Sequence, residues 1–256
     1  MHMSDKEQLL DLALRVGKKA AELLMQRPDV LEVSTKSSDV DIVTQMDKAS
    51  EALIVSSILA ERPDDGMIGE EGADRESTSG ITWVIDPLDG TVNYFYGLPG
   101  WNVSIAAKDK DGVVVGVVVS PTLNSTWWAI RGGGSFHNGK KLTCNDPVEL
   151  NRAMLATGFA YESEKRELQL QFINTLMSQI RDIRRNGAAA VDLCFVGAGN
   201  VDAYFESGLN EWDLAAGGLI AKEAGAIVDQ HQMGGQNFTL AAGPHLHQIL
   251  KNTLGL

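Results

Sequence analysis

The stretch WVIDPLDGTVNYFYGLPG, residues 83–100, contains two closely spaced aspartates, and the functional interpretation of the sequence starts from them. Apolar residues typical of a buried strand run into Asp86, and Asp89 follows ahead of Gly90 and Thr91. No lysine or arginine lies within the stretch to neutralise the two acids. Because neighbouring carboxylates repel each other and burial strengthens the repulsion, the pair requires a cation that the stretch itself does not provide.

Two further acidic segments lie elsewhere in the chain: GEEG at residues 69–72 contains Glu70, and EWDLAAG at residues 211–217 contains Asp213. Together with Asp86 they form a set of oxygen ligands with no histidine or cysteine near it, which favours Mg²⁺ or Mn²⁺ over zinc and copper. Mg²⁺ binds one or two carboxylates together with water and phosphate oxygens. The residues alone therefore predict a metal-assisted phosphate hydrolase.

These residues also have ordinary structural interpretations when they are taken one at a time. Asp213 lies near a predicted helix start, where an acid interacts favourably with the helix dipole. Asp89-Gly90 is a common turn sequence. If a helix begins at Gly90 and Thr91, its free backbone N–H groups could face a phosphate. The combination of these features, and not any single one, predicts a site.

The overall composition limits the classes of protein to which the chain can belong. A formal net charge of −12 argues against non-specific binding to nucleic acid, whose phosphates need lysine and arginine. No apolar run approaches the roughly 20 residues that span a bilayer, and the first residues lack the basic and apolar regions of a secretory signal. Cys144 and Cys194 are far apart, as expected of reduced thiols. We therefore expect a cytoplasmic protein with no membrane or nucleic-acid partner.

Hydrophobic patterning predicts a chain of mixed helices and strands. Helices are predicted over residues 9–24, 44–59, 162–180 and 188–199, with another near Asp213, and strands over 81–85, 103–108, 112–120, 125–130, 153–158 and 201–206. Asn138-Gly139 predicts a hairpin turn. Because the elements do not alternate strictly, the pattern favours a layered α+β fold over a doubly wound parallel sheet. No repeat or linker is visible, which predicts a single domain over residues 1–256.

Four segments, in order, resemble the inositol monophosphatase family, and within it the bacterial inositol-1-monophosphatases. They are TKSSDVDIVTQMD at 35–47, GEEG at 69–72, DPLDGTVN at 86–93 and WDLAAG at 212–217. The resemblance covers nearly the whole chain. It implies a layered α/β/α/β/α sandwich of the inositol monophosphatase and fructose-1,6-bisphosphatase type, and a homodimer.

The resemblance also implies the metal ligands. Glu70, Asp86 and the carbonyl oxygen of Leu88 would hold a first Mg²⁺ ion. Asp86, Asp89 and Asp213 would hold a second, so that Asp86 bridges the two. Glu70 would reach a third, weaker ion through water, and Mn²⁺ could replace Mg²⁺. The cation that the opening stretch requires is then a metal ion.

Four residues receive catalytic roles from the same resemblance. Glu70 and Thr91 would orient the attacking water, Asp47 would accept a hydrogen bond from the Thr91 hydroxyl, and Lys36 would support this network. Without the resemblance, Thr91 is a helix-capping residue, Asp47 is a helix-start acid and Lys36 is a solvated surface lysine. No serine–histidine pair is needed, because a metal-activated water is the nucleophile.

The resemblance further assigns contacts to the substrate. They come from Asp89, Gly90 and Thr91, from Gly187 and Ala189 in RNGAAAVD at 185–192, and from Glu206. A carboxylate such as Glu206 can accept hydrogen bonds from neighbouring hydroxyl groups, as a polyol requires. The alternative for Glu206 is a surface acid at a strand end. Ala188 stands where relatives often carry serine or threonine, which leaves the identity of the alcohol open.

The expected function is Mg²⁺-dependent hydrolysis of myo-inositol monophosphates, with lithium inhibition. Phosphatases of histidinol phosphate, fructose 1,6-bisphosphate and 3′-phosphoadenosine 5′-phosphate in the same family are the alternatives within this class. A regulatory protein that associates with the transcription machinery is the alternative of another class, because one bacterial relative behaves in this way. The basic cluster RDIRR at 181–185 is the surface for such a partner, although an interface or pairing within the chain is the simpler interpretation.

Overall fold

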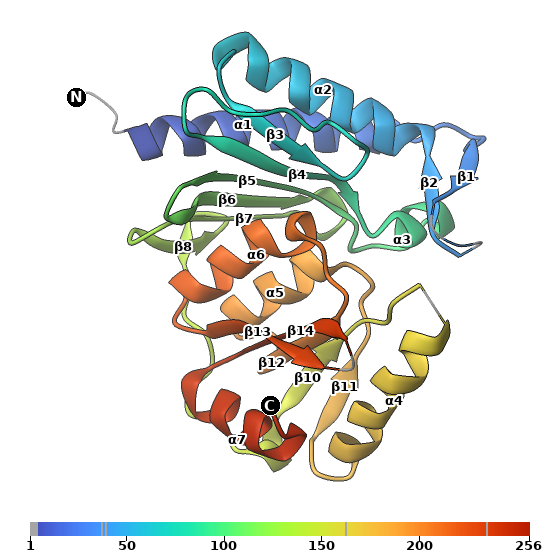
Figure 1. Ribbon diagram of the computed structural model, residues 1–256, viewed down its shortest axis with the longest axis vertical. Helices are drawn as coiled ribbons and strands as arrows, with labels where there is room; N and C mark the ends of the chain where they lie inside the picture. The colour runs from blue at the N-terminus through green and yellow to red at the C-terminus, as the bar shows by residue number, and fades with distance from the viewer. Residues whose placement is uncertain (1–4, 37, 39, 162, 234) are drawn as a thin grey trace.

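The chain folds into five layers, stacked in the order helix, sheet, helix, sheet, helix (Figure 1). The computed structural model describes every residue except 1–4, 37, 39, 162 and 234. Helices α1 (Asp5–Met25) and α2 (Gln45–Glu61) form the first layer. Buried apolar residues of α1 recur at helical intervals from Leu9 to Leu24 and pack against the sheet beside them. Both helices are predicted by the sequence.

The second layer is a seven-stranded sheet. In spatial order its strands are β3 (Gly66–Gly69), β4 (Thr82–Asp89), β5 (Asn102–Asp109), β6 (Gly112–Ser120), β7 (Ser125–Ile130), β8 (Gly134–His137) and β9 (Lys140–Lys141). Strand β3 runs parallel to β4, and the other named pairs are antiparallel. Asn138 and Gly139 join β8 to β9 with φ angles of 47° and 81°, which confirms the predicted hairpin turn.

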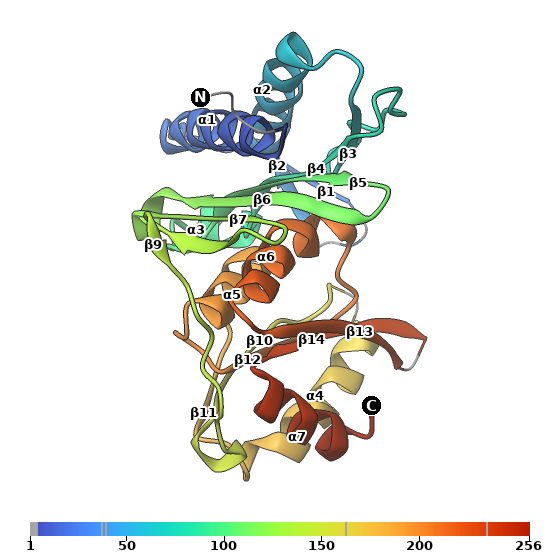
Figure 2. The same ribbon diagram turned by 90° about the vertical axis from the view of Figure 1, so that its left-hand side faces the viewer.

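Helices α5 (Ala189–Gly197) and α6 (Glu211–Glu223) form the third layer, between the two sheets (Figure 2). Small residues let the two helices approach each other closely. A Cβ atom on Gly217 of α6 would lie 2.8 Å from the carbonyl oxygen of Ala190 in α5, so only glycine fits there. This close packing fixes the starts of the two helices relative to each other, and both starts face the cavity described below.

The fourth layer is a five-stranded sheet of mixed direction, and two helices cover its outer face (Figure 1). In spatial order the strands are β11 (Asp182–Arg184), β10 (Met154–Thr157), β12 (Ala203–Ser207), β14 (Gln236–Ala242) and β13 (Ile227–Met233). The fifth layer consists of α4 (Ser163–Met177) and α7 (Pro244–Leu254). Phe172 of α4 packs on Phe238 of β14, with ring centroids 4.9 Å apart. Glu162, the first residue of the helix predicted here, lies outside the described residues.

These layers confirm the expected α+β fold and the α/β/α/β/α order. The elements outside the five layers are short: β1 (Val33–Thr35), β2 (Ile42–Thr44), α3 (Thr91–Tyr96) and the 3₁₀ turns Pro121–Leu123 and Leu150–Arg152. In the part of the chain that the structure describes, no helix has the length and apolar character needed to cross a membrane.

Strand β4 departs from its prediction in a way that shapes the site. The sequence predicts a strand over 81–85 that ends in an aspartate turn, but pairing with β5 continues to Asp89. The register shifts between Asp86 and Asp89, which marks a β-bulge or a similar irregularity. It contains Pro87, which has no N–H to donate to the ladder and whose carbonyl oxygen accepts a hydrogen bond from Ser50 of α2 (2.8 Å). Such bulges re-aim side chains.

Candidate active site

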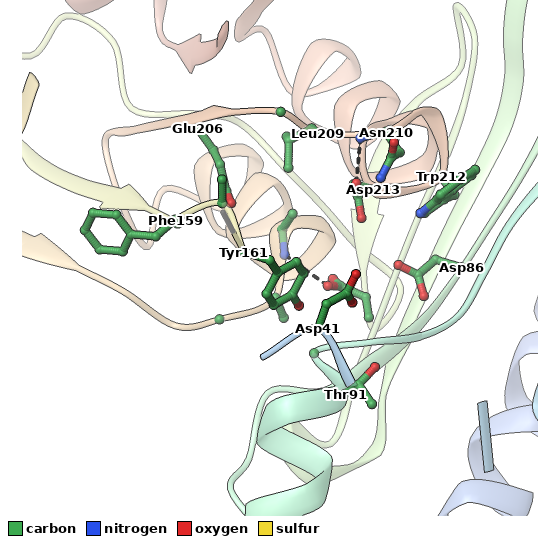
Figure 3. A pocket seen from close by; sticks show the side chains of 18 of the residues that line it. Asp41, Asp86, Thr91, Phe159, Tyr161, Glu206, Leu209, Asn210, Trp212 and Asp213 are labelled. Atoms are coloured by element: carbon green, nitrogen blue, oxygen red, sulfur yellow. Dashed lines mark hydrogen bonds between the residues drawn. The ribbon is translucent and has the colours of Figure 1, made fainter. Parts of the chain in front are cut away.

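A cavity of about 490 Å³ lies where the end of β4 meets α3, the starts of α5 and α6, and the segment after β10 (Figure 3). The predicted site residues that line it are Lys36, Glu70, Asp86, Leu88, Asp89, Gly90, Thr91, Gly187, Ala189, Glu206 and Asp213. Asp47, the remaining predicted residue, contacts Thr91. The fold therefore gathers the predicted residues from both halves of the chain around one space.

Asp89 connects β4 with the start of α5. The side chain accepts hydrogen bonds from Asn102 Nδ2 (2.8 Å) and from the backbone N–H groups of Ala189 (3.2 Å) and Ala190 (2.9 Å). The last two donors belong to the first turn of α5, where the helix dipole favours an anion. Burial raises the pKa of Asp89 to about 6, although these hydrogen bonds oppose the rise.

Asp86 is a buried acid that is repelled by the other acids of the cavity. It is 2% exposed, and its Oδ1 atom accepts a hydrogen bond from the N–H of Leu88 (3.0 Å). Burial raises its pKa well above the ordinary range, and the charges of Glu70, Asp89 and Asp213 raise it further. A cation at this point would remove both the repulsion and the cost of burying the charge.

Asp213 has the helix-start role that its sequence position suggests and also faces the cavity. Its Oδ2 atom accepts a hydrogen bond from the N–H of Asn210 (2.7 Å), which completes a capping box at the start of α6 (Figure 3). Burial raises its pKa well above the usual value, and the charge of Asp89 is the next cause. The two interpretations of Asp213 are therefore compatible.

Thr91 and Asp47 form the predicted contact. The Thr91 hydroxyl lies 2.9 Å from Asp47 Oδ1 and 3.1 Å from the carbonyl oxygen of Leu88, so either can accept its proton. Asp47 is fully buried, and its other oxygen accepts from the N–H (2.8 Å) and hydroxyl (2.6 Å) of Thr44 in the capping box of α2. Burial raises the pKa of Asp47, and the hydrogen bonds from Thr44 and Thr91 oppose the rise. The helix-start acid thus also fixes the threonine at the cavity.

Glu70 is held by an ion pair with Lys36. Lys36 Nζ lies 2.9 Å from Glu70 Oε1 and also contacts the Glu71 carboxylate. Burial alone would lower the pKa of Lys36, but the two glutamates raise it. Glu51 of α2 accepts a hydrogen bond from the N–H of Glu71 (2.9 Å) and so anchors the same segment. Lys36 is exposed at the surface, and its ammonium group pairs with both glutamates.

The donor chemistry of the cavity fits Mg²⁺, although the side chains are not arranged as ligands. Within the residues that the structure describes, no three His, Cys, Asp or Glu side chains are placed so that they could hold a metal ion. Each of the four carboxylates accepts a hydrogen bond or ion pair from a protein donor, such as Lys36 for Glu70 and Asn210 for Asp213. The set still consists of oxygen donors whose mutual repulsion a hard cation would remove. The ligand roles therefore stay predictions.

Glu206 lies across the cavity from Asp86, beside Phe159 (Figure 3). It belongs to β12 and is half-buried, and Tyr204 donates a hydrogen bond to its Oε2 atom (2.5 Å). Burial raises the pKa of Glu206 to about 7, while the Tyr204 hydroxyl and Arg185 oppose the rise. The alternative interpretation of Glu206 as a surface acid is therefore wrong.

Several cavity residues escape prediction from the sequence. They are Asp41, Phe159, Tyr161, Lys165, Arg185, Asp192 and Trp212. Arg185 and Asp192 lie in the segment 185–192, and the resemblance of this segment to the family was the only sequence signal that placed them near the substrate. Asp192 is 1% exposed, and Asn186 donates a hydrogen bond to its Oδ1 atom (2.5 Å). Arg185, predicted as part of a basic surface cluster, instead contributes to the cavity wall.

Comparison with known proteins identifies the family. Residues 5–251 match the inositol monophosphatase family. The chain belongs to this family. This membership supports a phosphatase, from a family that is generally metal-dependent.

Similar proteins in this family carry two kinds of name. A protein from Pasteurella multocida, named Nus factor SuhB, is 40% identical over 255 residues, covering 96% of this chain and 95% of its own. The crystal structure of the extragenic suppressor protein suhB from Bartonella henselae has a TM-score of 0.90 at 30% identity, covering 96% of this chain and 98% of that one. A Thermotoga maritima IMPase has a TM-score of 0.88 at 31% identity, covering 97% of each chain. The inositol monophosphatase fold thus extends over the whole layered structure.

Proposed function

We propose that the chain is a Mg²⁺-dependent phosphatase that hydrolyses myo-inositol monophosphates to myo-inositol and phosphate. One observation carries the proposal: Glu70, Asp86, Asp89 and Asp213 line the same cavity as the Thr91 hydroxyl, which Asp47 holds from behind. Membership of the inositol monophosphatase family supports the reaction class. The choice of inositol rests on Glu206, which faces the acids across the cavity.

The four acids are the proposed metal ligands. Glu70, Asp86 and the carbonyl oxygen of Leu88 would hold one Mg²⁺ ion, and Asp86, Asp89 and Asp213 would hold another, with Mn²⁺ as a possible substitute. The bound ions would supply a water of lowered pKa and stabilise negative charge on the oxygens of the phosphate ester. A third ion would be reached by Glu70 through water.

The remaining catalytic residues orient the nucleophile. The Thr91 hydroxyl donates toward Asp47 or the carbonyl oxygen of Leu88, so its lone pairs remain available to a water in the cavity. Glu70 can accept a hydrogen bond from the same water, because Lys36 pairs with the carboxylate and holds it in place. The protein then supplies position and charge, and a water molecule supplies the attacking oxygen.

The substrate contacts follow from backbone groups and two acids. Gly90 and Thr91, at the start of α3, line the cavity where a phosphate would meet backbone N–H groups. Gly187 and Ala189, before and at the start of α5, line the same space, and the N–H of Ala189 also donates to Asp89. The left-handed φ angles of Gly90 (87°) and Gly187 (86°) favour glycine. Asp89 and Glu206 would accept hydrogen bonds from the alcohol.

The proposal is tested by phosphate release from a panel of esters in the presence of Mg²⁺. The panel contains inositol 1-phosphate, histidinol phosphate, fructose 1,6-bisphosphate and 3′-phosphoadenosine 5′-phosphate. The account predicts the highest kcat/KM for inositol 1-phosphate and inhibition by Li⁺ at the second metal position. A clear preference for histidinol phosphate would instead assign Glu206 to binding the ammonium group and would contradict the inositol assignment.

A second candidate function is association with the transcription machinery. The observation that favours it is the name Nus factor SuhB carried by relatives 40–42% identical to this chain. Complementation separates the two functions: in a host whose own gene is deleted, a metal-ligand variant such as Asp86→Asn is expected to abolish phosphatase activity. Rescue of growth by that variant would show that a regulatory function is sufficient, and failure would assign the phenotype to the phosphatase.

The assembly and location of the protein are also proposals. We expect residues 1–256 to form one domain and the protein to be a cytoplasmic homodimer. Tyr96 and Leu98, which follow the cavity segment, are 70% and 52% exposed and offer apolar surface for a second copy. Light scattering at micromolar concentration measures the assembly directly, and a monomer would contradict it.

A further inference from the structure

The carboxylate of Glu206 occupies a space that exists because residue 158 is glycine. Strand β10 pairs with β12 in parallel, with Thr157 opposite Phe205, so Gly158 and Glu206 are the next residues along. A Cβ atom on Gly158 would lie 1.9 Å from Glu206 Oε2 and 2.3 Å from Oε1. Gly158 does not have a left-handed φ angle, so its backbone conformation does not require glycine. A side chain at residue 158 would therefore displace the Glu206 carboxylate from its present position.

A second contact fixes the same carboxylate from its own strand. Tyr204 and Glu206 are two positions apart in β12, so their side chains lie on one face of the sheet. The Tyr204 side chain is fully buried, and its hydroxyl donates to Glu206 Oε2. Hydrogen bonds to a carboxylate are stronger than those between neutral groups. Burial and the charge of Glu206 raise the pKa of Tyr204, which keeps the hydroxyl protonated as a donor.

We propose that Gly158 and Tyr204 are positioning residues that set the substrate specificity of the cavity by fixing Glu206. The proposal rests on the proposed function, because Glu206 is the acid that would receive the hydroxyl groups of inositol. With Oε2 held by Tyr204, the carboxylate cannot rotate freely, and its lone pairs keep one direction relative to the acids across the cavity. Among the residues that the structure describes, neither Gly158 nor Tyr204 forms a hydrogen bond with a proposed metal ligand.

The test compares two substrates in two variants. For Tyr204→Phe and for Gly158→Ala, kcat/KM is measured with Mg²⁺ on inositol 1-phosphate and on p-nitrophenyl phosphate, which has no neighbouring hydroxyls. We expect a loss of about five- to tenfold on inositol 1-phosphate, mainly through KM, because one well-placed hydrogen bond to a charged group is weakened. Turnover of p-nitrophenyl phosphate should change by less than about twofold, because its phosphate contacts are untouched.

The chain offers a matched control for the tyrosine. Tyr94 is also buried, at 1% exposure, and its hydroxyl donates to the carbonyl oxygen of Leu24 (2.8 Å), away from Glu206. Tyr94→Phe removes an equivalent buried hydrogen bond and should not change the ratio of kcat/KM between the two substrates. Thermal unfolding confirms that each variant is folded, and if Gly158→Ala fails to fold, Tyr204→Phe carries the test alone.

A double-mutant cycle separates positioning from general support. If Tyr204 acts through Glu206, Tyr204→Phe should have little further effect in a Glu206→Gln background, where the charge is already gone. Additive effects, or equal losses on both substrates, would overturn this inference while leaving the phosphatase assignment intact. If the wild-type protein released phosphate from neither ester with Mg²⁺, the proposed function itself would fail, and this inference with it.

Discussion

The two sides of the cavity are built in different ways. On the acid side, close neighbours in sequence hold two of the acids: Leu88 donates to Asp86, and Asn210 donates to Asp213. On the opposite side, Glu206 is held by Tyr204 of its own strand, but its position also depends on clearance at Gly158, in another strand. The acids of the acid side lie in short sequence motifs and can be recognised there. The opposite side exists only when the five-stranded sheet has formed. The acid side should therefore govern turnover of every substrate, and the opposite side should govern which substrate is preferred.

The largest effect should follow from changing the acid side itself. Asp86→Asn removes the acid that would be a ligand of both proposed ions, and we expect kcat to fall by about a thousandfold on all esters. In metal-free buffer, the variant should be at least as stable as the wild type, because a buried carboxylate that its neighbours repel is gone. Phosphate release and thermal unfolding in EDTA measure the two effects.

Asp65 provides a matched control for this substitution. It is 1% exposed and lies outside the cavity, where it accepts hydrogen bonds from Trp83 Nε1 (2.8 Å) and Ser79 (2.6 Å). Asp65→Asn should lower the free energy of unfolding by about 2–3 kcal/mol and leave kcat unchanged. If both variants lost activity and stability together, Asp86 would have a structural role only.

The next effect concerns the pair that orients the water. Thr91→Ala should lower kcat by about a hundredfold and change KM little, because the hydroxyl positions a nucleophile and does not grip the substrate. Asp47→Asn should have a similar effect, because it holds the hydroxyl. Steady-state kinetics of the double variant test the coupling. Simple additivity would show that Thr91 and Asp47 act separately.

A smaller and selective effect is expected on the opposite side. Glu206→Gln keeps an acceptor oxygen and removes the charge, so kcat/KM for inositol 1-phosphate should fall about tenfold. p-Nitrophenyl phosphate should be hardly affected, and histidinol phosphate should lose more, because its ammonium group loses an ion pair. Equal losses on all three substrates would mean that Glu206 supports the acid side or the fold.

The smallest effect is a dependence on pH. Burial raises the pKa of Glu206 to about 7, so its carboxylate, the form that only accepts hydrogen bonds, increases as pH rises through that value. The ratio of kcat/KM for inositol 1-phosphate to that for p-nitrophenyl phosphate should therefore rise as the pH rises through about 7 and level off above that value. The ratio for Glu206→Gln should stay flat. A ratio that falls with rising pH would contradict the assignment.

The same contrast explains what the sequence could and could not predict. The layered fold and the acid side could be predicted from the sequence, because helical periodicity and the four segments that resemble the family are local features. The extension of β4 to Asp89 was missed because Pro87 is normally a strand breaker, and only the irregular pairing accommodates it. Strands β13 and β14 were not predicted. Strand β13 has mostly half-buried and exposed residues and is at the sheet edge, so it lacks a buried apolar run.

The opposite side of the cavity was harder to predict from the sequence, for a physical reason. Gly158 has no signature of its own in the sequence, and its meaning appears only when β10 and β12 pair. Tyr161 and Asp41 both line the cavity but come from the segment after β10 and from the start of the chain, so only the tertiary fold brings them to the same space (Figure 3). Because this side of the cavity depends on residues of this kind, the sequence supports the reaction class more firmly than the substrate.

The most direct test of the central claim is phosphate release from inositol 1-phosphate by the purified protein, first in EDTA and then as Mg²⁺ is added back. The acids that line the cavity are proposed to be the metal ligands, so the account predicts no turnover in EDTA and full recovery with Mg²⁺. Asp86→Asn should show no recovery at the same Mg²⁺ concentrations. Undiminished turnover by the wild-type protein in metal-free buffer would contradict the account.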